Sequence, residues 1–292
     1  LFGGTIGTAT ASFNDDGIPY GSVFGGSRGT AAIETSDVAT LSPLYNHIPE
    51  YYLGYVNKTV VNVGGTSPSA LSANTPIIYG SLYGGAQDGH VRNSTEVKIF
   101  KGNVAGQTSD ANGRSGHVFG AGSGIGTYVD KNDGDKHKVN SSSGSVTCTT
   151  LVELNGGSIT GNIYGGGALS SVGPSKIGDK NEQHAASDSH KSFSKTQVDI
   201  KGGSVGGSVY GASRGPGDAY YESQFSSIQT YDRTKFATDI WSDVTVSGGT
   251  IGNNVYGGGQ GGIVKESTTV SLTGGDIAHD AYGGGQGTQY LA

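Results

Sequence analysis

Hydrophobic residues recur along this chain in two short phrases that alternate. The first places aliphatic residues two positions apart, as in Val244-Thr-Val246 and Val270-Ser-Leu272, and runs through a glycine pair to one more aliphatic residue. A period of two puts the aliphatic side chains on one face of a strand. The glycine pair predicts a bend between two strands, because glycine readily adopts positive φ.

The second phrase is an aliphatic residue, an aromatic residue and then glycines. Repetition at this scale predicts stacked repeat units, each of which buries its apolar face against its neighbours. The copies are Val23-Phe24-Gly25-Gly26, Leu82-Tyr83-Gly84-Gly85, Val118-Phe119-Gly120, Ile163-Tyr164-Gly165-Gly166-Gly167, Val209-Tyr210-Gly211, Val255-Tyr256-Gly257-Gly258-Gly259 and Ala281-Tyr282-Gly283-Gly284-Gly285, with Leu1-Phe2-Gly3-Gly4 as an eighth.

The spacing of the aromatic residues predicts one repeat per turn of the chain. Tyr256 and Tyr282 lie 26 positions apart, while Tyr164, Tyr210 and Tyr256 follow one another at intervals of 46. The longer intervals hold polar inserts, such as Lys176–Ser194 and Asp218–Asp239, which we expect to leave one corner as loops. We predict an all-β fold, a single-stranded right-handed parallel β-helix (β-solenoid) of about eight rungs.

The repeats run through all 292 residues, so we predict a single β-solenoid domain over 1–292. The chain opens inside a repeat, which suggests a fragment or processed region of a longer protein. The copy at Ala11–Ile18 is the most degenerate, because Asp15 and Asp16 replace the glycine pair. This acidic pair could mark a sugar-cleaving site, or it could be a polar turn.

The aromatic residues of the second phrase should stack into a ladder. Such a ladder could bind glycans with its ring faces, or it could be a packing element inside the fold. Its members are Phe24, Tyr83, Phe119, Tyr164, Tyr210, Tyr256 and Tyr282.

A polar column lies four residues after each aromatic residue. Glutamine above glutamine can form amide ladders, whereas the alternative is a solvated corner. The members are Arg28, Gln87, Ser123, Ala168, Arg214, Gln260 and Gln286.

No group of residues predicts catalysis, cofactor binding or metal binding. The seven histidines show no metal-ligand spacing, and Asp130, Asp133 and Asp135 do not match a calcium loop. Cys148 stands alone, so we expect a small packing residue and no disulfide within the chain. We therefore predict that the protein is not an enzyme and holds no cofactor.

One insert differs from the others in its tyrosine content. Tyr45, Tyr51, Tyr52 and Tyr55 lie close together, and tyrosine is enriched at contact surfaces. The segment could contact a partner, or it could fold back over the side of the stack.

The composition of the chain limits the classes of partner that it is expected to bind. Glycine accounts for 54 residues, charged residues for 14% and the net charge is −6. The negative charge disfavours nucleic acids as partners, and no 18-residue apolar run predicts a membrane span. The glycine-rich, methionine-free composition suits an extracellular protein.

The phrase Gly-Gly-Thr-Ile-Gly-Asn-Asn-Val-Tyr-Gly-Gly-Gly at 248–259 resembles repeats of glycine-rich, adhesin-like surface proteins of Bacteroidetes and other gut bacteria. The resemblance implies secretion, a cell-surface or extracellular location, and a structural or adhesive role.

Three functions follow as hypotheses. The first is a structural or adhesive protein, which could be a filament subunit that binds copies of itself head to tail through open β edges. The second is a glycan-binding module that uses exposed tyrosines. The third is a polysaccharide lyase or hydrolase.

Overall fold

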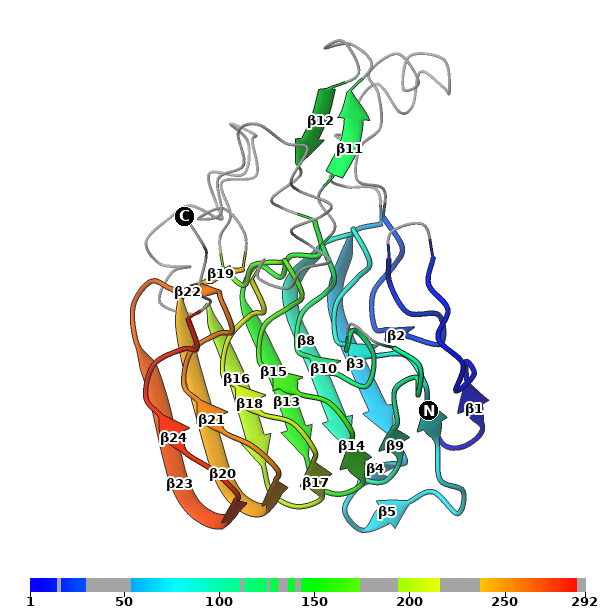
Figure 1. The fold of residues 1–292 in the computed structure, drawn as a ribbon, viewed down its shortest axis with the longest axis vertical. Helices are drawn as coiled ribbons and strands as arrows, with labels where there is room; N and C mark the ends of the chain where they lie inside the picture. Colours follow the sequence, from blue (N-terminus) through cyan, green and yellow to red (C-terminus); the bar gives the residue numbers. More distant parts are fainter. Residues whose placement is uncertain are drawn as a thin grey trace.

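The computed structural model describes residues 1–14, 17–29, 54–110, 113–124, 127–130, 136–139, 143–173, 194–215 and 237–287. Within these ranges the chain is all-β, with 24 strands and no helix. Most strands lie in two curled sheets of 11 and 7 strands, where they run side by side (Figure 1). Every strand pair within these two sheets is parallel.

The 11-stranded sheet has a part made of long strands and a part made of short ones. The strands β20 and β23 extend through both parts and join them. The long strands are β3 (Val56–Val63), β8 (Val91–Ile99), β13 (Thr149–Leu154), β16 (Lys195–Ile200), β20 (Trp241–Ile251) and β23 (Thr268–Ile277). The short strands are β1 (Thr5–Ile6), β6 (Ile77–Ile78), β9 (Asn103–Val104), β14 (Ser158–Ile159) and β17 (Ser204–Val205).

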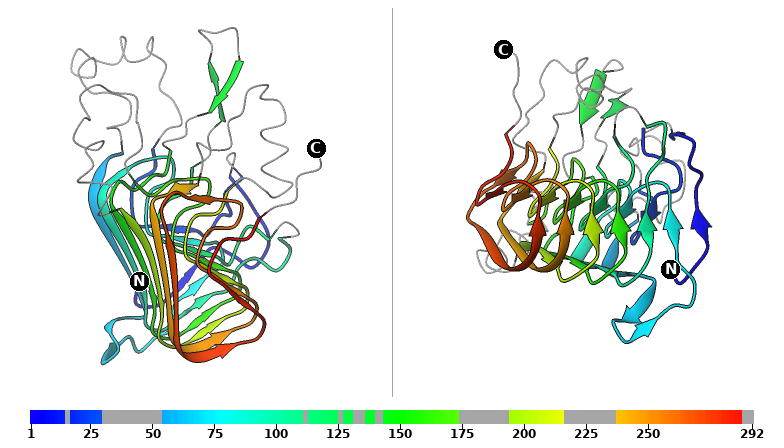
Figure 2. Two further views of the ribbon diagram at one scale, coloured as in Figure 1. Left: turned by 90° about the vertical axis from the view of Figure 1, so that its left-hand side faces the viewer. Right: turned by 60° about the horizontal axis from the view of Figure 1, so that its bottom comes forward.

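The 7-stranded sheet holds the aliphatic-aromatic phrases in exact sequence register. Val118, for example, lies between Leu82 and Ile163, and each aromatic residue pairs with the next aromatic residue. Its strands are β2 (Val23–Phe24), β7 (Leu82–Tyr83), β10 (Val118–Phe119), β15 (Ile163–Tyr164), β18 (Val209–Tyr210), β21 (Val255–Tyr256) and β24 (Ala281–Tyr282). An inner repeat such as β13–β15 therefore contributes a long and a short strand to the 11-stranded sheet and one strand to the 7-stranded sheet. Figure 2 shows the repeats following one another along the molecule.

Three two-stranded sheets complete the fold. The pairs β4 (Gly65–Ser67) with β5 (Ala70–Leu71), and β11 (Thr127–Asp130) with β12 (Lys136–Val139), are antiparallel. The pair β19 (Thr238–Asp239) with β22 (Ile263–Val264) is parallel. In Figure 1 the β11–β12 hairpin projects away from the two large sheets.

The glycine pairs form the predicted bends. The second glycine of each pair has positive φ, at +88° in Gly157 and +77° in Gly249. The first glycine meets a different constraint, since a Cβ on Gly156 would lie 2.6 Å from the carbonyl oxygen of Phe100 in the preceding repeat. Both positions thus require glycine, one for its backbone angle and one for close packing of neighbouring repeats.

The aliphatic residues of both phrases form one continuous core. Val97, Val152, Val198 and Val244 lie above one another and are at most 1% exposed. Val244 pairs with Val270, Val246 with Leu272 and Ile251 with Ile277, as expected for equivalent positions of stacked repeats. Adjacent strands lie about 4.8 Å apart, so each repeat covers the apolar face of the next.

Three sequence-based expectations need correction. The strands form several sheets rather than the single-stranded arrangement expected: the glycine bends keep the chain within the 11-stranded sheet, as from β13 to β14, and the turn after each short strand leads into the 7-stranded sheet, as from β14 to β15. Leu1-Phe2-Gly3-Gly4 is not an eighth aromatic phrase. The pairing of Thr5–Ile6 with Ile77–Ile78 places Leu1 at the end of the first phrase and Gly4, with φ of +81°, at the bend. Finally, the segment at Ala11–Ile18 is no copy of the first phrase, since Phe13 makes an isolated antiparallel bridge with Pro19.

Candidate functional site

The aromatic residues form the predicted stack. Centroids of successive rings lie 4.5–5.0 Å apart, and their planes differ by only 3–9°. The stacked residues are Phe24, Tyr83, Phe119, Tyr164, Tyr210, Tyr256 and Tyr282. The parallel register of the 7-stranded sheet causes this arrangement, because it holds equivalent side chains one strand spacing apart.

Most of this aromatic ladder faces the interior. The five rings from Tyr83 to Tyr256 are at most 8% exposed, whereas Tyr282 is 45% exposed. Each inner ring has both faces covered by neighbouring rings, so a sugar could not stack on it. Only the two ends of the ladder, at Phe24 and Tyr282, have a ring face that no other ladder ring covers.

The polar column is connected to the ladder by hydrogen bonds. Tyr164 donates its hydroxyl to Oε1 of Gln260 at 2.5 Å, and Tyr210 does the same to Gln286. The Nε2 group of Gln260 also donates to Oε1 of Gln286 at 3.3 Å, which confirms an amide pair at this step. Successive members from Arg28 to Gln286 are linked by parallel bridges.

Burial changes the character of this corner. Gln87, Ser123 and Arg214 are at most 8% exposed, so the polar column is not a solvated corner at these positions. Burial also raises the pKa of the Tyr210 hydroxyl, which therefore remains a hydrogen-bond donor throughout the physiological range. The column acts in the described structure as a polar support for the aromatic ladder.

A second polar column precedes the aliphatic-aromatic phrase, and sequence reasoning missed it. At each step a side chain accepts the backbone N–H of the equivalent residue in the next repeat, over distances of 2.7–3.3 Å. We call it the acceptor column. Its members are Ser22, Ser81, His117, Asn162, Ser208, Asn254 and Asp280. The available signal was a residue with a hydrogen-bond acceptor directly before each aliphatic-aromatic pair.

The imidazole of His117 forms hydrogen bonds with both of its ring nitrogens as a member of the acceptor column. Its Nδ1 accepts the N–H of Asn162 at 2.9 Å, so the ring proton is on Nε2, which donates to the carbonyl oxygen of Gly113 at 2.6 Å. Both ring nitrogens are thus occupied in a neutral imidazole. The ring is 6% exposed and contacts the edges of Phe119 and Tyr164.

A column of hydroxyl residues crosses the interior and was also missed. Thr95 and Thr150, each two residues before a core valine, donate to the carbonyl oxygens of Gly120 and Gly165 at 2.5 and 2.6 Å. These bonds join the long strands to the 7-stranded sheet within one repeat. Equivalent bonds come from Thr59, Ser242 and Thr268. The pattern Thr/Ser-x-Val-x-aliphatic would have revealed them.

Two buried titratable groups lie near the inserts. Asp239, fully buried in β19, accepts the N–H groups of Val172 and Ser213 at 2.8 and 2.7 Å and the hydroxyl of Ser213 at 2.9 Å. Burial raises its pKa to about 6. Burial lowers the pKa of His90 to about 4, and its Nδ1 lies 3.0 Å from the hydroxyl of Ser145. The end of the Asp218–Asp239 insert is thus a core strand rather than a loop.

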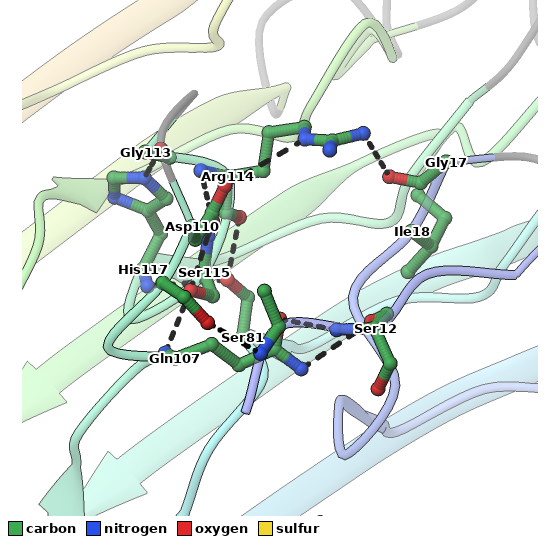
Figure 3. Close-up of polar contacts among 12 residues, drawn as sticks. Ser12, Gly17, Ile18, Ser81, Gln107, Asp110, Gly113, Arg114, Ser115 and His117 are labelled. Atoms are coloured by element: carbon green, nitrogen blue, oxygen red, sulfur yellow. Dashed lines mark hydrogen bonds and ion pairs between the residues drawn. The ribbon is translucent and has the colours of Figure 1, made fainter. Parts of the chain in front are cut away.

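Two side loops are joined by the polar contacts drawn in Figure 3. Gln107 exchanges hydrogen bonds with the backbone of Ser12 and donates to the carbonyl oxygen of Tyr20. Arg114 packs over the ring of Phe13, 3.5 Å from its centroid, and donates to the carbonyl oxygen of Gly17. These contacts tie the first repeat to the third.

Asp110 organises the second of these loops. One oxygen, Oδ2, accepts the N–H groups of Arg114 and Ser115 at 2.6 and 2.7 Å and the hydroxyl of Ser115 at 2.9 Å. Its other oxygen lies 3.8 Å from Nε of Arg114. Both carboxylate oxygens of Asp110 thus contact groups of its own loop, so we interpret this cluster as a structural element that holds the loop together.

The remaining candidate residues either lie outside the described part of the chain or are half-buried. Tyr45, Tyr51, Tyr52, Asp15 and Asp16 lie outside the described residues, and Tyr55 is half-buried. Cys148 is half-buried, and burial raises the pKa of its thiol, which disfavours the reactive thiolate. Among the described residues, no three His, Cys, Asp or Glu side chains are grouped so that they could hold a metal ion.

The last repeat forms an open end. Leu272 and Tyr282 are 48% and 45% exposed, although the equivalent residues Ile200 and Tyr164 are fully buried. The hydroxyl of Tyr282 donates a hydrogen bond to Oδ2 of Asp280 at 3.1 Å, and this bond raises the pKa of the tyrosine. Among the described strands, β23 and β24 lie at sheet edges and pair on one side only.

Comparison with known proteins gives no relative. No family model, no curated protein and no solved structure matches the chain. Within the part of the chain that the structure describes, no helix is long and apolar enough to span a membrane.

Proposed function

We propose that this chain is an extracellular structural or adhesive protein built as a right-handed parallel β-solenoid. In this proposal each repeat is one rung, and the rungs continue from one copy to the next by head-to-tail contact of open β edges. Parallel pairing of every repeat with the next supports the solenoid. The right hand follows from the general rule for parallel crossover connections.

The open C-terminal edge carries the functional part of the proposal. Leu272 occupies an aliphatic core position and Tyr282 a position of the aromatic ladder. Both positions are buried in the inner repeats, and both side chains are about half exposed here. Exposed apolar side chains beside the unpaired backbone N–H and C=O groups of an edge strand favour pairing with another sheet edge. A head-to-tail contact that continues the stack along its own axis does not close into a ring, so it produces a linear filament.

The rest of the described chain fits a structural role. The inner ring faces are covered, the buried carboxylate of Asp239 is hydrogen-bonded to the backbone, and the polar columns join repeat to repeat. Low charge and high glycine content also suit a secreted, repetitive protein.

Electron microscopy and sedimentation velocity over a concentration series test this proposal. We expect filaments with an axial repeat of about 34 Å, from seven repeats at about 4.8 Å each, or longer where side loops intervene. Leu272→Lys should abolish filaments by placing a charge on the open edge. The control Thr245→Lys adds the same charge to the outer surface of an inner repeat and should leave filaments intact. A wild-type protein that stays monomeric at all concentrations would refute the proposal.

A further inference from the structure

The acceptor column has a direction. In all six observed steps the side chain belongs to the earlier repeat and the N–H to the later one, from Ser22 and Ser81 at the start to Asn254 and Asp280 at the end. The column therefore ends with an acceptor, the carboxylate of Asp280, and begins with a donor, the N–H of Ser22. No described residue continues the column beyond either end.

The backbone of the 7-stranded sheet has the same direction. Val255 donates its N–H to the carbonyl oxygen of Asp280, and Gly257 donates to that of Tyr282. The equivalent groups of the last repeat, the N–H of Ala281 and of Gly283, therefore point away from the stack. At the other end, Val23 donates to Ser81 and Gly25 to Tyr83, so the carbonyl oxygens of Ser22 and Phe24 point outward.

These two edges are complementary, group by group. We propose that β24 of one copy pairs in parallel with β2 of a second copy, and that Asp280 of the first copy accepts the N–H of Ser22 in the second. Ala281 and Gly283 then donate to the carbonyl oxygens of Ser22 and Phe24. Tyr282 stacks on Phe24 and extends the aromatic ladder across the contact.

Asp280 also selects the direction of assembly. The five inner positions of the acceptor column hold only neutral side chains, and the carboxylate stands at the open end alone. Paired with an N–H group, a carboxylate makes a stronger hydrogen bond than a neutral acceptor. Contact between two C-terminal edges would instead bring together two Asp280 carboxylates, and Asp276 adds a further negative charge to each edge.

This inference rests on the proposed head-to-tail filament and specifies its contact. The test uses the full chain with Cys148→Ser, and places single cysteines at opposite ends as Val23→Cys and Ala281→Cys. Parallel neighbours lie about 4.8 Å apart, within reach of a short thiol cross-linker. We expect cross-linked pairs when the two variants are mixed, and none from Ala281→Cys alone.

Substitution of Asp280 provides the second measurement. Asp280→Ala removes the acceptor and should weaken association about tenfold or more, as expected for a hydrogen bond to a charged group. Asp280→Asn keeps an acceptor that the column already uses at Asn162 and Asn254, so association should stay within about threefold. His279→Ala, beside it, should have no effect.

The outcomes separate the two proposals. A wild type that remains monomeric overturns both. Filaments that form with unchanged affinity after Asp280→Ala, or cross-links that form from Ala281→Cys alone, overturn the assigned contact and leave the filament in place.

Discussion

The fifth and the last repeats of this protein have closely similar sequences and very different surroundings. Val198-x-Ile200 with Tyr210 and Val270-x-Leu272 with Tyr282 are equivalent segments. Ile200 is fully buried and Tyr210 is 3% exposed, whereas Leu272 and Tyr282 are about half exposed. Burial in this fold is thus supplied by the neighbouring repeats and not by the repeat's own sequence. Matched substitutions in inner and last repeats should therefore differ in their effects.

The largest difference should come from the glycine after the aromatic residue. A Cβ at Gly165 would overlap the carbonyl oxygen of Gly211, whereas nothing lies within 4 Å of the Cβ position at Gly283. We expect Gly165→Ala to lower the free energy of unfolding by more than about 4 kcal/mol, and Gly283→Ala by less than about 1 kcal/mol. Urea denaturation monitored by circular dichroism measures both. Equal effects would show that the last repeat is as constrained as the inner ones.

Truncation of a core residue should give the next largest difference. Ile200→Ala removes a fully buried side chain and should destabilise the protein by about 3 kcal/mol, from lost burial and the cavity left behind. Leu272→Ala, at the equivalent position on the open edge, should cost less than about 1 kcal/mol in the monomer. The comparison must be made at concentrations where no association occurs. A cost near 3 kcal/mol for Leu272→Ala would mean that the edge is covered in solution.

The response to pH should distinguish the inner repeats from the end, because the buried His90 and Asp239 belong to inner repeats. With a folded pKa of about 4, His90 binds fewer protons folded than unfolded, so its contribution to stability falls as pH drops from about 6.5 to 4. With a folded pKa of about 6, Asp239 binds more protons folded than unfolded, so its contribution rises as pH falls from about 6 to 4. The two contributions, each on the order of 3 kcal/mol, oppose one another.

Removal of the histidine should expose the second contribution. We expect His90→Asn to become more stable as pH falls from 6 to 4, whereas the wild type changes little. The protection of β23 and β24 against hydrogen exchange, after correction for the pH dependence of intrinsic exchange, should stay the same over this range, because neither group lies in the last repeat. A His90→Asn variant that loses stability on acidification would contradict the raised pKa of Asp239.

The smallest effect concerns the hydroxyl column. Thr150→Val removes the donor to the carbonyl oxygen of Gly165 and leaves that buried oxygen without this bond, which should cost about 1–2 kcal/mol. The same change at Thr268, whose bond to Gly283 is exposed, should cost less than about 0.5 kcal/mol. Thermal unfolding of the two variants gives the comparison. Equal shifts in melting temperature would mean that burial does not set the strength of these bonds.

Much of the fold was predictable from periodicity. The alternating aliphatic residues, the glycine bends and the stacked aromatic ladder follow from a period of two, from positive φ and from strict repetition. The first four residues were misread because Leu1-Phe2-Gly3-Gly4 satisfies both phrases, and only the pairing of Thr5 with Ile77 decides between them. The acceptor column was missed because its members share no chemical class; serine, histidine, asparagine and aspartate are alike only in accepting an N–H.

The sequence by itself determined the repeat, the all-β class and the residues that lie above one another, because equivalent positions in a regular stack must coincide. Only the tertiary structure decided which face of the aromatic ladder is covered, which carboxylate is buried and which end is open. These properties depend on the neighbours that each repeat meets. Asp280 illustrates the difference: its sequence context repeats that of Asn254, but no described repeat follows to donate an N–H to its carboxylate, which instead accepts the hydroxyl of Tyr282.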